Sequence, residues 1–246
     1  MGRGEGGVDA RILPPSFYAR RALTVARNLL GCLLISRVEG ELTGGIIVET
    51  EAYAGATDGA SHAFRYHRSP RVESMYGDPG TAYVYLIYGI HNCLNAVCLR
   101  RGEPHAVLIR AIFPGVGIPA MRRRRGAAKG RGRKIRGLAD GPGKLCRALG
   151  IDRSLDGAPL TDPRGTLRVL RGIELPGYKR RRRVGIESRG GFAALPWRFV
   201  ADEPPPRTFR GLSGKLLADP PPHKLDRGMQ TKRPPGRREG LMSSDV

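Results

Sequence analysis

Apolar residues recur in short runs separated by glycine, proline and charged residues, and the spacing within each run predicts an element. Residues 16–30 carry an apolar stripe at helical spacing; Ser16 can cap the start of this helix and Gly31 fits its end. A second, shorter helix is predicted over residues 142–149, with proline at its first position and Gly150 directly after it. Both helices are short.

Most of the apolar runs are rich in β-branched and aromatic residues and predict strands. Turn sequences at residues 39–41 and 89–92 would join neighbouring strands into hairpins. Because strands follow one another without helices between them, we expect an α+β (mixed α/β) fold in which peripheral helices pack on an antiparallel sheet. The expected strands are residues 32–38, 43–53, 81–88, 93–99, 106–113, 167–171 and 197–200.

Three segments lack these patterns. Residues 1–10 are glycine-rich and are expected to form a flexible tail, and residues 201–246 are proline-rich and are expected to be disordered. Residues 54–79 are loop-like, and long loops in compact proteins are often functional. A single compact domain is therefore expected over residues 11–200.

The charge of the chain points to a polyanionic partner. Of 246 residues, 43 are basic and 22 are acidic, which gives a formal net charge of +21. A compositional bias of the genome would explain arginine in place of lysine, but not this excess of basic over acidic residues. Nucleic acid is the first candidate partner, and the basic runs at residues 122–136 and 179–183 are expected to grip phosphate.

Other classes of protein find no support in the sequence. No apolar stretch approaches the ~18 residues of a membrane span, and the N-terminus has no apolar core typical of a secretory signal. Neither a phosphate-binding loop nor a hydrolase nucleophile elbow is present. The four cysteines have no CxxC spacing, so we expect reduced thiols and no zinc site with His62 or His67.

Two carboxylates in an apolar strand are the first candidates for chemistry. Glu49, Glu51 and Tyr53 share a face if the strand is regular, and one carboxylate could activate water or stabilise a cationic transition state. An ion pair with an arginine would serve equally well, and the pattern does not choose between Glu49 and Glu51. Arg110, inside another apolar strand, needs an acceptor such as one of these carboxylates.

Tyrosines crowd one strand of a chain that is only 6% aromatic. Tyr83 and Tyr85 face the same side, and Tyr88 ends the strand at a hairpin tip, where it could wedge into a base stack. Tyrosine also simply favours strands, and for the triplet taken alone this explanation comes first. Asn95 is a polar residue in an apolar strand and should have a partner, which could be backbone or a base edge.

Several motifs, in order, resemble those of the alkyladenine (3-methyladenine) DNA glycosylase family. They are IVETEAY (47–53), ASHAFR (60–65), SPR with MYGDPGTAYVYLIYGIHNCLN (69–95), AVLIRA (106–111), DGPGKLCRALG (140–150) and RVG (183–185). The resemblance covers about residues 11–200. It implies a curved antiparallel sheet with a DNA-intercalating hairpin, and hydrolysis of the N-glycosidic bond of alkylated or deaminated purines.

The resemblance also implies roles for individual residues. Glu51 would be the general base that activates water, and Arg110 would help to hold it. Asn95 would disfavour the exocyclic amine of normal guanine, and Tyr88 would fill the gap left in the duplex. The walls that stack on the flipped base would be Tyr53, His62 and Tyr85.

The expected partner is double-stranded DNA that contains damaged purines, with no cofactor, no metal, no membrane and no obligate protein partner. No lysine nucleophile corresponds to the family pattern, so no strand-cutting step is expected. The protein would work in the cytoplasm at the nucleoid if bacterial, or in the nucleus if eukaryotic. The alternatives are a non-enzymatic basic DNA- or RNA-binding protein, which would leave Glu51 unexplained, and a metal-dependent nuclease.

Overall fold

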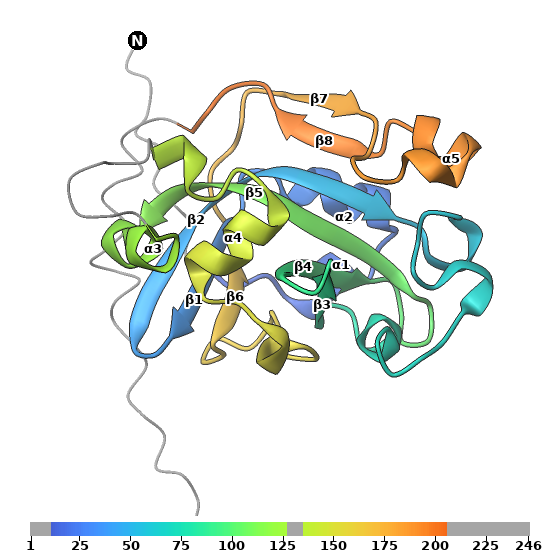
Figure 1. The fold of residues 1–246 in the computed structure, drawn as a ribbon, viewed down its shortest axis with the longest axis horizontal. Helices are drawn as coiled ribbons and strands as arrows, with labels where there is room; N and C mark the ends of the chain where they lie inside the picture. The colour runs from blue at the N-terminus through green and yellow to red at the C-terminus, as the bar shows by residue number, and fades with distance from the viewer. Residues whose placement is uncertain (1–10, 127–134, 206–246) are drawn as a thin grey trace, which may run out of the picture.

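A computed structural model describes residues 11–126 and 135–205 of the chain. Its centre is a curled sheet in which all neighbouring strands run antiparallel, in the order β3-β4-β5-β2-β1-β6 (Figure 1). Strand β8 also pairs with β2, and β7 pairs with β8. The expected α+β fold is confirmed. The strands are β1 (Leu33–Val38), β2 (Glu41–Tyr53), β3 (Ala82–Ile87), β4 (His91–Cys98), β5 (His105–Val116), β6 (Leu167–Leu170), β7 (Tyr178–Arg181) and β8 (Arg198–Ala201).

Strand β2 is the longest and organises the sheet. One edge of β2 pairs with β5, whereas its other edge pairs first with β1 and then, from Glu49 to Glu51, with β8. The pairing with β5 is irregular on both sides of Glu49, where Val48 and then Arg110 stand as extra residues. Such bulges re-aim side chains and are frequent beside active sites. The second half of β2 therefore brings β5 and the late β7–β8 hairpin to the same carboxylates.

Helices cover the sheet and complete one main core. Helix α2 packs against β2 and β5. Helix α4 packs against β4 and β5 and lies in front of these strands in Figure 1. Apolar side chains from α2, α4 and the inner strand faces form a contiguous buried cluster. The helices are α1 (Pro15–Tyr18), α2 (Ala22–Leu29), α3 (Ile118–Arg124), α4 (Pro142–Leu149) and α5 (Gly191–Ala194).

The single helix expected over residues 16–30 is wrong, because it is two helices. Helix α1 ends at Tyr18 and α2 begins at Ala22, and neither has a side-chain cap. Between them, the backbone carbonyls of Tyr18 and Arg20 both accept hydrogen bonds from the Leu99 amide at the end of β4. This tertiary pairing uses carbonyls that a continuous helix would need for itself.

Most other element predictions are close to the structure. Helix α4 has the expected bounds, and Gly150 after it is left-handed at φ 71°. Strand β7 was missed, because its residues YKRR are exposed and have no apolar alternation. The loop from 54 to 79 contains three short 3-10 turns and no strand. Of the predicted tails, residues 1–10 and 206–246 lie outside the described residues, whereas Ala201, where the second tail was expected to begin, is the last residue of β8.

Within the part of the chain that the structure describes, no helix has both the length and the apolar character to cross a membrane. The four cysteines are buried free thiols.

Candidate active site

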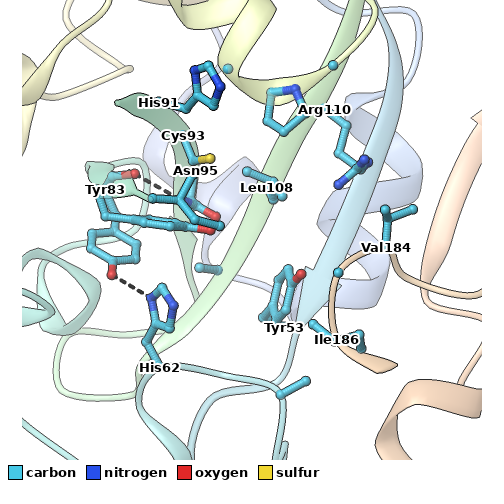
Figure 2. A pocket seen from close by; sticks show the side chains of 18 of the residues that line it. Tyr53, His62, Tyr83, His91, Cys93, Asn95, Leu108, Arg110, Val184 and Ile186 are labelled. Carbon is cyan, nitrogen blue, oxygen red and sulfur yellow. Dashed lines mark hydrogen bonds between the residues drawn. The ribbon is translucent and has the colours of Figure 1, made fainter. Parts of the chain in front are cut away.

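A cavity of about 630 Å³ opens between the β3–β4 hairpin, the start of α4 and the segment that follows β7. Its volume is within the range of small-molecule sites. Six of the seven residues predicted for the site line this cavity: Tyr53, His62, Tyr85, Tyr88, Asn95 and Arg110. Four of them, Tyr53, His62, Asn95 and Arg110, can be followed in Figure 2. The structure thus brings together residues that are up to 57 positions apart in the sequence.

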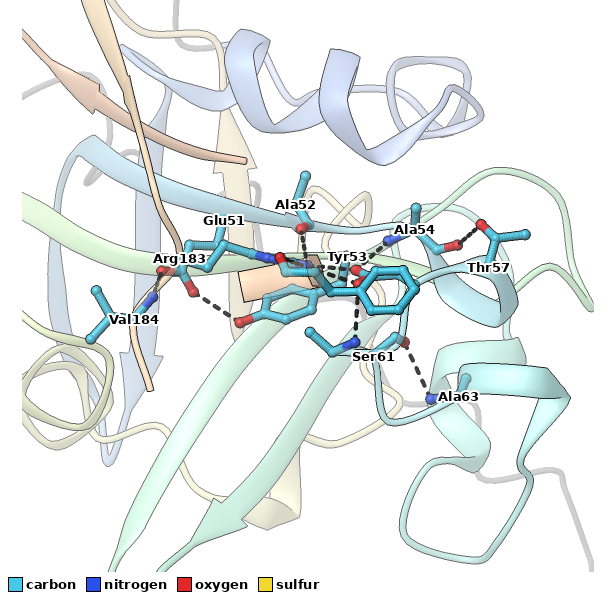
Figure 3. Close-up of polar contacts among 12 residues, drawn as sticks. Glu51, Ala52, Tyr53, Ala54, Thr57, Ser61, Ala63, Arg183 and Val184 are labelled. Atoms are coloured by element: carbon cyan, nitrogen blue, oxygen red, sulfur yellow. Dashed lines mark hydrogen bonds and ion pairs between the residues drawn. The ribbon is translucent and has the colours of Figure 1, made fainter. Parts of the chain in front are cut away.

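Glu51 lies directly behind the wall of this cavity and has no exposed surface. Its Oε1 accepts a hydrogen bond from the Val184 amide at 2.8 Å, and its Oε2 accepts one from the Tyr53 hydroxyl at 2.9 Å (Figure 3). The Arg110 guanidinium is 3.4 Å from Oε2. Tyr53, Arg110 and Val184 all line the cavity, so these three polar partners of the carboxylate also border the space for a ligand.

Glu49 and Glu51, between which the sequence pattern did not choose, have different environments. Glu49 Oε1 accepts hydrogen bonds from Arg110 Nε at 2.8 Å and from Arg198 at 3.1 Å, so it holds the arginine from behind. Glu51 is completely buried and shares Arg110 with it. Glu49, Glu51 and Tyr53 share one face as predicted, and Arg110 is both an ion-pair partner and a pocket residue.

Burial changes the acid–base properties of this cluster. Loss of hydration raises the pKa of Glu51, although Arg110, the Val184 amide and the Tyr53 hydroxyl act in the opposite direction. Burial and the adjacent Glu51 charge also raise the pKa of Tyr53, so its hydroxyl stays protonated and donates. A carboxylate that is buried, held by donors and next to a cavity has the properties of a general base.

Aromatic rings form the opposite side of the cavity. The His62 ring lies edge-on to Tyr85 at 4.6 Å between centroids, and a hydrogen bond of 2.8 Å joins His62 Nδ1 to the Tyr83 hydroxyl (Figure 2). Burial, and to a lesser extent the nearby charges of Arg71 and Arg189, lowers the pKa of His62 to about 4. The ring is therefore neutral at neutral pH. The predicted shared face of Tyr83 and Tyr85 is confirmed, with their centroids 5.3 Å apart.

Asn95 is fixed at the base of this aromatic wall. Its side chain is 3% exposed, and its amide nitrogen donates to the Tyr83 carbonyl at 3.0 Å. The sequence predicted a partner that would be either backbone or a base edge, and the structure supplies the backbone partner. The amide is therefore held in one position where it borders the cavity.

Tyr88 stands at the tip of the β3–β4 hairpin and is 81% exposed. Tyr88 and Gly89 both have positive φ, 53° and 70°, and the Ile90 amide donates to the Ile87 carbonyl. These are the marks of a type I′ turn, which asparagine and glycine usually form. Tyrosine at a left-handed position is uncommon, and such positions concentrate at functional sites.

The basic run at 179–183 was expected to grip phosphate as a whole, and for Arg183 this is wrong. Its side chain is buried, and its two terminal nitrogens contact both oxygens of Asp58, which is buried as well. Buried arginine requires such a partner. The preceding residues of the run, from Lys179 to Arg182, are exposed.

Part of the site was not anticipated. Tyr83 had a usable signal, since it shares a strand face with Tyr85. Val184 contacts Glu51 through its backbone, so its side chain carries no signal, although the RVG motif that contains it was recognised. Leu108 and Ile186 complete the apolar lining and look like ordinary core residues in sequence. No group of three His, Cys, Asp or Glu that could hold a metal occurs among the described residues.

Comparisons with known proteins agree with this geometry. The family model described as "Methylpurine-DNA glycosylase (MPG)" matches residues 16–205. A protein of Desulfitobacterium hafniense is 44% identical over 190 residues, 76% of this chain and 93% of that protein. One of Myxococcus xanthus is 42% identical over 201 residues, 79% of this chain and 95% of the relative. Both are named "Putative 3-methyladenine DNA glycosylase". The chain therefore belongs to the methylpurine-DNA glycosylase family.

Proposed function

We propose that this DNA glycosylase flips an alkylated or deaminated purine out of duplex DNA and hydrolyses its N-glycosidic bond, as the first step of base-excision repair. Chemistry on a base requires that the base leave the stack and enter a fitted pocket. The observation that carries the proposal is the buried Glu51 carboxylate directly behind an aromatic-walled cavity of about 630 Å³.

In the proposed reaction, the bond between base and sugar breaks through an oxocarbenium-like state, and water adds to the sugar. Glu51 accepts the proton from this water, and its negative charge stabilises the cationic sugar. Because Glu51 has no exposed surface, water reaches it only when the wall formed by Tyr53, Arg110 and Val184 moves locally. Arg110, held by Glu49, keeps the carboxylate oriented.

The remaining pocket residues suit a flipped purine. Tyr53, His62 and Tyr85 offer ring faces or edges, and because the His62 ring is neutral at neutral pH it does not repel a cationic base. Asn95 would exclude the exocyclic amine of normal guanine. Neutral purines such as hypoxanthine would also need a proton on the departing base.

The DNA around the flipped base would meet the hairpin tip and a basic rim. Tyr88 would fill the gap in the stack. Arg125, Lys144 and Arg189 border the cavity and would approach phosphates. Lys144 pairs with Asp140 at 2.9 Å, and we propose that it supports DNA binding rather than a covalent strand-cutting step.

The test uses duplexes that each carry one defined lesion: 3-methyladenine, 7-methylguanine, hypoxanthine or ethenoadenine. The proposal predicts that free base is released in the presence of EDTA, while the strand stays intact until alkali cleaves it at the abasic site. Strand scission without alkali, or trapping of the enzyme on DNA by borohydride, would contradict a monofunctional reaction. Loss of activity in EDTA would favour a metal-dependent nuclease, and binding without base release would favour a non-enzymatic protein.

A further inference from the structure

Arg183 lies outside the residues that line the cavity, yet it adjoins both residues that donate hydrogen bonds to Glu51, Val184 and Tyr53. It follows β7 and is fully buried, with Asp58 as a buried ion-pair partner. It also donates to the Ala52 carbonyl at 3.0 Å and to the Phe192 carbonyl at 3.2 Å. One guanidinium thus ties the end of β2, the loop after it and the segment between β7 and β8.

Each oxygen of Glu51 accepts a hydrogen bond from a residue that is either next to Arg183 in the chain or in contact with its guanidinium. The donor to Oε1 is the amide of Val184, the next residue in the chain. The donor to Oε2 is the hydroxyl of Tyr53, whose ring lies 4.7 Å from the Arg183 guanidinium carbon. The Trp197 ring lies 5.0 Å from the same carbon. Figure 3 shows Arg183 beside Tyr53, with Val184 reaching to Glu51.

Asp58 anchors the arginine from the other side. Its two oxygens also accept the amides of Ala54 and Ala60, each at 3.1 Å, so the carboxylate organises the turn that leads from β2 to His62. A bidentate arginine–carboxylate pair has a fixed geometry that a lysine does not reproduce. The orientation of the Arg183 guanidinium is therefore fixed by Asp58 at its terminal nitrogens and by the nearby rings of Tyr53 and Trp197.

We infer that Arg183, anchored by Asp58, is a positioning residue for base hydrolysis, which places the Val184 amide and the Tyr53 hydroxyl on the two oxygens of Glu51. This inference rests on the proposed role of Glu51. The alternative is that the pair only holds the fold together, and a buried pair does link three segments here. The two views differ in whether the acid–base behaviour of Glu51 depends on Arg183.

The pH dependence of the chemical step separates them. Both donors favour the charged form of Glu51, so their displacement raises the pKa of the carboxylate and moves the acidic limb of the rate profile to higher pH. A purely structural pair would not move that limb. The other charged or titratable groups around Glu51 are Glu49 on β2, Cys93 on β4, Arg110 on β5 and, through Glu49, Arg198 on β8.

The experiment compares the wild-type protein with Arg183→Lys and with the double variant Arg183→Met/Asp58→Asn. The double variant leaves neither charge of the pair unpartnered, so it carries the test if Arg183→Lys does not fold. Single-turnover base release at saturating enzyme is measured across pH, together with affinity for the damaged duplex and thermal unfolding. The control is Thr50→Val, at the residue directly before Glu51. This change removes the buried hydrogen bond from the Thr50 hydroxyl to the Ala26 carbonyl and does not alter the contacts of the Glu51 carboxylate.

We expect the folded Arg183 variants to lose about 10²-fold in single-turnover rate. Their acidic limb should move to higher pH, and affinity for the damaged duplex should stay near that of the wild type. Thr50→Val should melt earlier and keep the wild-type limb. A folded Arg183 variant with the wild-type rate and limb would overturn the inference, as would a loss of rate with no shift of the limb. If Glu51→Gln retained full activity, the proposed function itself would fail, which is a separate result.

Discussion

Tyr53 serves the pocket in two ways, and the two can be separated by removal of a single oxygen atom. Its ring forms part of the cavity wall, and its hydroxyl donates to Glu51 at 2.9 Å. Arg183 packs near the ring. A phenylalanine at this position would keep the wall and the packing while removing one of the donors to the carboxylate.

Tyr53→Phe should therefore raise the pKa of Glu51. A group whose pKa is raised needs a higher pH to ionise, so base release should fail earlier as the pH falls. A hydrogen bond to a charged group contributes ~1.5–3 kcal/mol, so a shift of about one to two pH units is expected. Single-turnover rates from pH 4 to 9 measure the limb, and binding of the damaged duplex is the control. A faster reaction with an unmoved limb would mean that the hydroxyl blocks water instead.

For individual residues, the sequence predicted which side chains belong to the site better than it predicted the contacts between them. Resemblance to the family indicated Glu51, Arg110 and the aromatic set, and the structure brings Arg110 and the aromatic residues to one cavity, with Glu51 buried behind its wall. Arg183 could not be read correctly, because it stands in a run of identical residues and only the distant Asp58 distinguishes it. Val184 acts through its backbone amide, a group that every residue except proline carries.

Among the elements, the β3–β4 hairpin has a proposed role in DNA binding that can be tested separately from base hydrolysis. Its tip holds Tyr88 exposed in a left-handed conformation, next to the cavity. Hydrophobic alternation was sufficient to predict this hairpin and most other strands. It failed for β7, whose exposed side chains have no alternation, and for the helix break at residues 19–21, which depends on a contact with Leu99 far along the chain.

Tyr88→Asn tests the tip while preserving its turn, because asparagine tolerates a positive φ. If Tyr88 wedges into the stack, affinity for a duplex with a lesion should fall by roughly 10-fold, since unstacking costs a few kcal/mol that a wedge offsets. Affinity for the same lesion in a single strand should change little. Fluorescence anisotropy on matched duplex and single-stranded probes makes the comparison. An equal loss on both probes would rule out the wedge.

For the whole molecule, the charge of +21 is not distributed as the linear runs suggested. In the described part of the run at 122–136, Arg123 and Arg124 both pair with Glu41, and Arg124 also donates to the Val38 carbonyl. Residues 127–134 lie outside the described part. Glu73 also pairs with a basic residue, Arg68. The basic residues that border the cavity are a more direct place for phosphate contacts.

Binding and chemistry should consequently respond differently to salt. Each neutralised phosphate contributes a slope of about −0.9 to the dependence of log affinity on log salt, so a footprint of several phosphates gives a steep loss. The cluster around Glu51 is buried and is screened far less. Affinity for undamaged duplex should fall by orders of magnitude between about 50 and 200 mM salt, while the single-turnover rate at saturating enzyme stays nearly constant. A rate that falls in parallel with affinity would contradict this separation.

The most direct test of the account is Glu51→Gln, which keeps the shape of the side chain and removes its charge. Single-turnover release of base from a duplex with one alkylated purine should fall by about 10²–10⁴-fold, the usual contribution of a general base. Affinity for the same duplex should remain, because Glu51 is buried behind the pocket wall. Release at the wild-type rate by a folded, DNA-binding Glu51→Gln variant would contradict the account.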